Sequence, residues 1–231
     1  MPSIAIITAR GGSKRIPKKN IKPFCGRPII EYSVHAALES GIFDEVMVST
    51  DSEEIARIAR DAGASVPFMR SAFTSSDYAT TKDVLTEVLT CYAQRGKRFT
   101  EMCCIYPTAP FVMAEKLRGA YEELLRTGAD SVMPVVQFSY PPQRAMVLRD
   151  GMLVYQYPEN FSKRSQDLEP IYHDCGQFYF YRIQDDLSYN TDSFAPIIVP
   201  ETEVQDIDNE SDWAIAEMKY RLMTGQVPSD C

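Results

Sequence analysis

The chain has 231 residues, with 24 Lys and Arg against 32 Asp and Glu, so its formal net charge is -8. Its 45% hydrophobic and 24% charged residues are typical of a folded globular protein, and we expect one domain over residues 1–231. The acidic balance argues against a nucleic-acid partner, and the absence of a basic-apolar leader or a long apolar run predicts a cytoplasmic protein with no membrane partner.

The first predicted strand, Ile4–Ile7, is a short apolar run that ends near Thr8. Gly11 and Gly12 follow, and without a Cβ they can take positive φ and bring N–H groups close to an anion. Six cationic side chains surround them: Arg10, Lys14, Arg15, Lys18, Lys19 and Lys22. Because α/β sheets bind ligands beyond the carboxyl ends of their strands, this cluster predicts a polyphosphate site, with a solvated basic loop as the alternative.

Two common phosphate-binding motifs are excluded by spacing. A Walker loop needs Gly-Lys-Ser/Thr after four intervening residues, but Ile16 and Pro17 stand five positions after Gly11 and Gly12. The dinucleotide fingerprint G-x-G-x-x-G fails because Ser13 follows Gly12. Neither a P-loop nucleotidase nor a standard Rossmann dehydrogenase is predicted.

Strands and helices then alternate along the chain. The predicted strands cover residues 46–48, 66–69, 102–106 and 131–136, and the predicted helices begin at Pro28, after Ser52, near Val84 and near Leu117. This alternation predicts an α/β fold with a doubly wound, mostly parallel sheet. Asp51 and Ser52 can cap the second helix, and Asp51 near a nucleotide ribose or a metal is the alternative.

The stretch Ala9–Asn20, ARGGSKRIPKKN, resembles the signature loop of the CMP-sugar synthetases, cytidylyltransferases that activate sialic acid and related nonulosonic acids. The later segments 164–168 and 172–179 resemble the pseudaminic branch of that family. The resemblance implies a nucleotidyltransferase with a GT-A-like, Rossmann-type fold, CTP and an acidic nine-carbon sugar as substrates, Mg²⁺ as cofactor and a homodimer. It implies nucleotide contacts from Ala9, Arg10, Gly11, Gly12, Ser13, Lys14, Lys19, Asn20, Arg70 and Thr81, with Thr80 as the alternative to Thr81.

Two further segments of the resembled pattern allow alternative interpretations. Arg70 and Thr81 flank a polar stretch, and a surface loop with a helix cap explains these residues about as well as a nucleotide contact. The turn Tyr106-Pro107-Thr108-Ala109-Pro110 resembles the family's Pro-Thr-x-Pro turn, but family members that take sialic acid usually have Gln where this chain has Tyr106. This departure argues against sialic acid itself.

Residues 137–170 differ in composition, with prolines, aromatics and short polar runs. We interpret them as an insertion, a hairpin with loops, which in the resembled family forms a dimer contact and closes over the partner's sugar site. A planar Arg suits a sugar carboxylate and Gln offers donors and acceptors, while pairing of the arginines with interface acids is the alternative. His173 as a base competes with a structural role. The predicted sugar contacts are Tyr106, Thr108, Gln143, Arg144, Arg164, Tyr172, His173 and Gln177.

Asp206 and Asp208 form the second chemical centre. Residues two apart in an extended chain face one side, so both carboxylates are expected at one point while Ile207 faces the core. Such a pair suits Mg²⁺, which takes one or two carboxylates together with substrate phosphates. The alternative is that Asp208 and Asn209 cap the helix that contains Ile215, Met218 and Leu222.

The combined hypothesis is Mg²⁺-dependent transfer of CMP from CTP to pseudaminic acid with release of pyrophosphate. Arg10, Lys14 and Lys19 are expected to neutralise the leaving group, with Asp206 and Asp208 on the metal. No residue stands out as a general base. The alternatives are transfer to sialic, legionaminic or 3-deoxy-octulosonic acid, and a nucleotide-binding regulator without turnover.

Overall fold

The computed structural model describes residues 2–226, whose strands form one seven-stranded sheet and two small two-stranded ones. The large sheet has the order β11-β6-β10-β5-β1-β4, and β9 pairs with β6. Its pairs β1/β4, β1/β5 and β6/β11 are parallel, whereas β10 is antiparallel to both neighbours. The strands are β1 (Ser3–Thr8), β4 (Glu45–Ser49), β5 (Glu101–Ile105), β6 (Ser131–Gln137), β9 (Tyr172–Asp174), β10 (Phe178–Arg182) and β11 (Ala195–Ile198).

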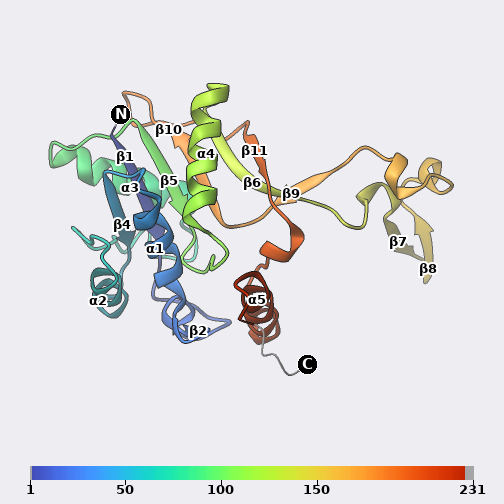
Figure 1. Cartoon of the computed structure of the whole chain (residues 1–231), viewed down its shortest axis with the longest axis horizontal. Helices are drawn as coiled ribbons and strands as arrows, with labels where there is room; N and C mark the ends of the chain where they lie inside the picture. The colour runs from blue at the N-terminus through green and yellow to red at the C-terminus, as the bar shows by residue number, and fades with distance from the viewer. Residues whose placement is uncertain (1, 227–231) are drawn as a thin grey trace.

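Helices cover both faces of the sheet, as the doubly wound prediction requires (Figure 1). Alternate strand residues point to opposite faces, so Ala5 and Ile7 pack with α1 (Ile29–Ser40), α2 (Glu53–Asp61) and α4 (Ala114–Thr127). Ile4 and Ile6 pack with α3 (Thr81–Gln94) on the other side. The predicted α/β fold is confirmed. Among the described residues, no helix is both long and apolar enough to cross a bilayer.

The strand predicted at residues 66–69 is wrong. Pairing beside β4 stops at Ser65, which donates to Val46 O and accepts from Val48 N, both at 2.9 Å. Pro67, two residues later, has no N–H to continue a ladder. The segment therefore continues as irregular chain toward Arg70.

The C-terminal helix α5 (Glu210–Met223) holds the cationic loop in place through an apolar cluster. Trp213, Ala216 and Tyr220 on α5 pack with two buried isoleucines, Ile16 from the loop and Ile207 from the acidic segment. The small hairpin β2 (Pro23–Phe24) and β3 (Arg27–Pro28) joins the same cluster. Shared burial of Ile16 and Ile207 thus brings the two predicted chemical segments together.

The apolar residues that predict this helix from the sequence lie on its solvent-exposed side. Ile215, Met218 and Leu222 are 43%, 67% and 61% exposed. The helix is held instead by edge-to-face aromatic contacts, among them Phe24 with Trp213 and with Tyr220, both at about 5.6 Å between ring centroids.

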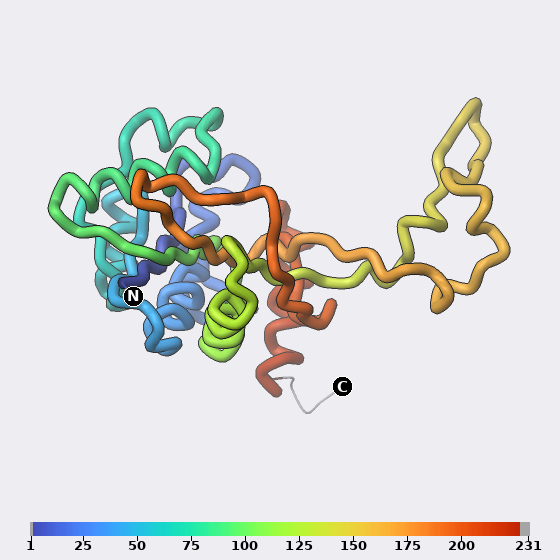
Figure 2. The backbone as a smooth tube through the Cα atoms, turned by 90° about the horizontal axis from the view of Figure 1, so that it is seen from above, coloured from blue at the N-terminus to red at the C-terminus, as the bar shows by residue number. Residues whose placement is uncertain are grey.

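The segment between β6 and β9 forms an arm that extends away from the body of the molecule (Figures 1 and 2). It contains the antiparallel hairpin β7 (Met146–Arg149) and β8 (Met152–Tyr155). Short 3-10 helices complete the chain: η1 (Lys19–Ile21), η2 (Pro142–Arg144), η3 (Pro158–Asn160), η4 (Ser165–Asp167) and η5 (Glu201–Glu203). Within one copy of the described chain, the hairpin is mostly exposed.

Candidate active site

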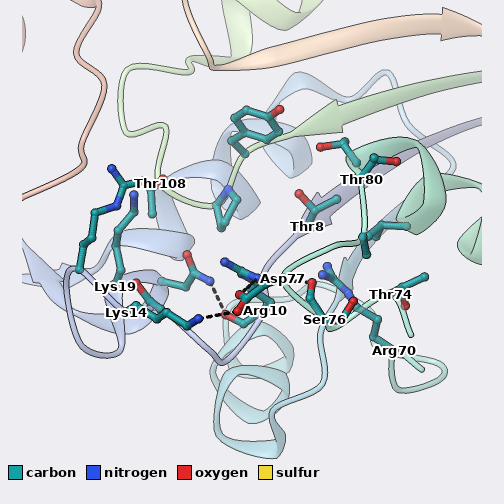
Figure 3. Close-up of a pocket in the computed structure, with 18 of the residues that line it drawn as sticks. Thr8, Arg10, Lys14, Lys19, Arg70, Thr74, Ser76, Asp77, Thr80 and Thr108 are labelled. Carbon is teal, nitrogen blue, oxygen red and sulfur yellow. Dashed lines mark hydrogen bonds and ion pairs between the residues drawn. The ribbon is translucent and has the colours of Figure 1, made fainter. Parts of the chain in front are cut away.

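A first cavity of about 530 Å³ opens beyond the carboxyl ends of β1 and β5, where α/β sheets bind ligands (Figure 3). Thr8 ends β1 and Tyr106 follows β5, so the sheet supplies the floor. Seven of the predicted nucleotide contacts line this cavity: Arg10, Ser13, Lys14, Lys19, Asn20, Arg70 and Thr81. Ala9 is instead fully buried, and its N–H donates to Ser49 O at 2.9 Å.

Three cations around this cavity have carboxylate partners within the protein. Arg10 and Lys14 both pair with Asp77, at 2.8 Å and 2.5 Å, from the loop that precedes α3 (Figure 3). Arg15 pairs with Asp208 at 2.6 Å. These side chains are substantially exposed, so each pair is weak and can be exchanged for a stronger anion.

Gly11 serves a purpose different from the one expected. Neither Gly11 nor Gly12 has positive φ. A Cβ on Gly11 would lie 3.2 Å from Cβ of Ser52, and its N–H donates to Asp51 Oδ1 at 2.7 Å. Ser52 caps α2, as its Oγ accepts from Ile55 N at 3.4 Å, whereas Asp51 does not cap the helix but ties the glycine turn to β4.

Lys19 lies where the cationic loop meets the acidic segment, and its Nζ donates to Ile207 O. Burial lowers the pKa of Lys19, while the charges of Asp208 and Asp206 oppose that shift. Asn20 donates to Arg10 O at 2.8 Å and so fixes the turn that carries Arg10. The loop is therefore braced from both ends.

Arg70 is a buried cation in the wall of the first cavity. Its guanidinium donates to Ser49 Oγ at 3.1 Å and to Ser49 O at 2.7 Å, and burial lowers its pKa. Thr80 forms the capping box of α3 with Asp83. Both Thr80 and Thr81 line the cavity, so the helix cap and the predicted nucleotide contact are adjacent residues.

A second cavity of about 650 Å³ adjoins the first. Lys19, Tyr106 and Thr108 line both cavities and so mark their junction. His173, Asp174 and Cys175 from β9 and its end form one wall, and the segment Val204–Ile207 with Lys219 of α5 forms another. Burial raises the pKa of Tyr106 and brings that of the Cys175 thiol to about 12, so neither is an anion near neutral pH.

The predicted sugar contacts are divided by the structure. Tyr106, Thr108 and His173 line the second cavity. Gln177 is 2% exposed and braces its wall, with Nε2 donating to Glu203 O at 2.7 Å. Tyr172 is on β9 with its side chain partly exposed.

Three other predicted sugar contacts are on the arm and bond within it. Gln143 donates to Glu169 O at 2.7 Å, Arg144 to Ser165 Oγ at 3.4 Å, and Arg164 pairs with Asp167 at 2.9 Å. Because the arm extends away from the body (Figure 2), one copy of the chain does not bring them to either cavity.

The acidic pair is shared between the two cavities. Ile207 is buried as expected, Asp208 lines the first cavity, and Asp206 lines the second. Asn209 with Asp212 forms the capping box of α5, which leaves the Asp208 carboxylate to face Arg15. No group of three His, Cys, Asp or Glu residues in the described chain could enclose a metal by itself. The two carboxylates, expected at one point, therefore line different cavities. As near neighbours in the chain they can still offer oxygen ligands to Mg²⁺, which completes its shell with phosphate oxygens and water.

Sequence reasoning missed three charged groups in these walls. Asp77 follows a run of small polar residues that gives no periodic signal. Asp174 accepts from Tyr179 Oη at 2.5 Å and from Gly176 N at 2.7 Å. Lys219 is one of two cations on α5, and only the packing of that helix reveals which of them faces the cavity.

Comparison with known proteins decides the family. A profile of the cytidylyltransferase family matches residues 4–191. The chain belongs to the cytidylyltransferases. This cytidylyltransferase is 39% identical to the pseudaminic acid cytidylyltransferase of Campylobacter jejuni, over 96% of this chain and 97% of that protein. It is 35% identical to the CMP-N,N'-diacetyllegionaminic acid synthase of Legionella pneumophila, again over 96% and 97%.

The fold agrees with this assignment. A solved CMP:2-keto-3-deoxy-manno-octonic acid synthetase complexed with CTP superposes on the cytidylyltransferase with a TM-score of 0.67, covering 98% of this chain and 100% of that one. The two sequences are only 16% identical, so this likeness concerns the fold alone. The resemblance seen in the signature loop is confirmed.

Proposed function

We propose that the protein transfers CMP from CTP to pseudaminic acid and releases pyrophosphate. The observation that carries the proposal is the junction at Lys19, Tyr106 and Thr108, where a cation-lined cavity meets a second cavity large enough for a sugar. The relatives in Campylobacter jejuni are named for this acid. CTP occupies the first cavity and the sugar the second.

In the transfer, the anomeric hydroxyl oxygen of the sugar attacks the α-phosphorus at the junction. A bond forms between that oxygen and phosphorus, the bond from phosphorus to the bridging oxygen breaks, and pyrophosphate leaves while the hydroxyl proton passes to solvent. Arg10, Lys14 and Lys19 neutralise the charge that grows on the leaving group. Gly11 and Asn20 hold the loop at the phosphates through their bonds to Asp51 and Arg10.

We propose Mg²⁺ as the cofactor, held by Asp206 and Asp208. When bound, it neutralises phosphate charge and polarises a phosphoryl oxygen. The donor set of two carboxylates supports this proposal, because oxygen ligands suit a hard cation.

The test is a pyrophosphate-release assay with CTP, Mg²⁺ and a panel of pseudaminic, legionaminic, sialic and 3-deoxy-octulosonic acids. We expect the highest kcat/KM with pseudaminic acid. Turnover of another acid but not of pseudaminic acid would correct the substrate, and CTP binding without turnover of any acid would indicate a regulator.

We also propose that two copies associate through the arm. Leu148 and Leu153 lie opposite each other in the hairpin and are 71% and 67% exposed, with Met146 on the same face at 47%. An exposed apolar face of this kind is typical of an interface. The partner's Arg144 and Arg164 would then be brought near the second cavity.

The arm is tested by the double variant Leu148→Glu/Leu153→Glu. Because two charges at a dry interface are costly to bury, we expect a monomer by analytical ultracentrifugation. Arg149→Glu, at an exposed position of the same hairpin, is the control. A double variant that stays dimeric would place the interface elsewhere.

A further inference from the structure

Lys219 of α5 is a cation in the second cavity for which the proposed mechanism has no role. Its side chain is half-buried, and its Nζ donates to Val204 O at 2.7 Å and to Glu201 O at 3.3 Å. Both partners are neutral main-chain carbonyls. Within residues 2–226, no carboxylate forms an ion pair with it.

A second lysine beside η5, Lys116, differs from Lys219 because it has a carboxylate partner. Lys116 also braces η5, but it pairs with Glu203 at 2.6 Å and donates to Phe111 O at 2.9 Å. Its charge is therefore compensated. Both lysines hold η5 in place, yet only Lys219 keeps an uncompensated positive charge, and its third N–H is not used by the two carbonyls.

The acidic side chains that line the same cavity bond to other groups or lie beside another lysine. The Asp174 carboxylate accepts from Tyr179 and Gly176, and Glu201 accepts from Ser139 Oγ at 3.4 Å. Asp206 lies beside Lys19, where its charge opposes the lowering of the Lys19 pKa by burial. A half-buried charge without a counter-ion favours an incoming anion, because its own desolvation is then offset by a charge-assisted hydrogen bond.

From this arrangement, and resting on the proposed function, we infer that Lys219 binds the carboxylate of the sugar acid. Lys19 and Lys219 bond to main-chain oxygens of Ile207 and Val204, in the segment that lines the second cavity. The carboxylate of a 2-keto sugar acid is attached to the carbon that bears the reacting hydroxyl. A carboxylate bound by Lys219 therefore fixes the position of the reacting hydroxyl within the second cavity.

Under this assignment, Lys219 favours the binding of acidic sugars over neutral ones. A neutral sugar of the same size leaves its ammonium group without a counter-ion, whereas an acid neutralises it. Recognition of the carboxylate then comes from α5, separately from contacts made by hydroxyl and acetamido groups elsewhere in the cavity.

The test is steady-state kinetics of Lys219→Met and Lys219→Gln with CTP and the acid that the wild-type enzyme uses best. We expect the KM for the acid to rise about ten- to a hundredfold in both variants, because a hydrogen bond to a charged group is lost. The KM for CTP should change less than about threefold. Gln keeps a donor for Val204 O, so it separates the charge from the support of η5.

Two controls sharpen the result. Arg221→Met removes a charge from the same helix at a residue that pairs with Glu217, and it should leave the KM for the acid unchanged. With the C1 carboxamide of the sugar, the wild type and Lys219→Met should have equal KM, because the group that Lys219 recognises is absent.

Three outcomes would overturn the inference. An unchanged KM for the acid, a Gln variant that behaves as wild type, or an equal loss for acid and carboxamide each assigns Lys219 to structural support alone. A wild type that turns over no acid overturns the proposed function and the role of Lys219 with it.

Discussion

The two cavities meet the charge of their ligands in opposite ways. In the first, Arg10 and Lys14 are paired with Asp77 and Arg15 with Asp208, so an incoming triphosphate exchanges existing ion pairs. In the second, Lys219 donates only to carbonyl oxygens among residues 2–226, so an acid bound there would supply a counter-ion. Ion-pair exchange keeps the cluster of cations around the first cavity compatible with the free fold.

The largest expected effect is at Asp208, the carboxylate that lines the first cavity. Asp208→Asn should lower kcat about 10³-fold, because several kcal/mol of metal-based stabilisation are lost, with the fold intact by circular dichroism. Asp192→Asn, in an exposed loop, is the control.

The companion change Asp206→Asn tests whether the cavities share one metal site. We expect a comparable loss of kcat. A variant that only raises the KM for the sugar acid would assign Asp206 to the second cavity and remove it from the metal.

An effect of intermediate size is expected for the pH dependence of kcat/KM, through Lys19 at the junction. Burial lowers the pKa of Lys19 from the usual 10.5, so its positive charge is lost as the pH rises through that lowered value. The kcat/KM for CTP should fall there, and Lys19→Arg should remove the fall because a guanidinium stays protonated. One pH unit above that pKa, the difference amounts to about tenfold.

The matched control for this profile is Lys97→Arg, since Lys97 pairs with Glu45 outside both cavities. An alkaline limb that persists unchanged in Lys19→Arg would show that another group titrates.

The smallest expected effect is a gain in affinity for CTP. Asp77→Asn removes the carboxylate that occupies Arg10 and Lys14, so CTP should bind roughly two- to fivefold more tightly by calorimetry, the range typical of exposed pairs. Asp61→Asn, which frees Arg57 on α2, is the control. Weaker CTP binding in Asp77→Asn would mean that Asp77 supports the loop and does not compete with the ligand.

The sequence predicts the first cavity better than the second for a physical reason. The strand Ser3–Thr8 and the loop that follows are adjacent in the chain, so one contiguous pattern contains both the buried strand and its cations. The second cavity is assembled from β9, the segment before α5 and α5 itself. Which face of α5 turns inward depends on Trp213 and Tyr220 packing with Phe24, a contact between distant segments.

Single backbone details also escape pattern reasoning. Gly11 is predicted for positive φ, but its use is the close approach to Ser52, which depends on where α2 begins. The strand expected at residues 66–69 has suitable side chains, and a single proline ends the pairing. Both errors arise where one neighbour decides the conformation.

The shared apolar anchor of Ile16 and Ile207 bears on how the enzyme is made. A ribosome completes the signature loop early, yet the loop acquires its support only after the acidic segment and α5 have left the exit tunnel. A nascent chain that lacks α5 therefore has the cations of the signature loop without the helix that supports them. The packing of the loop therefore depends on the presence of α5.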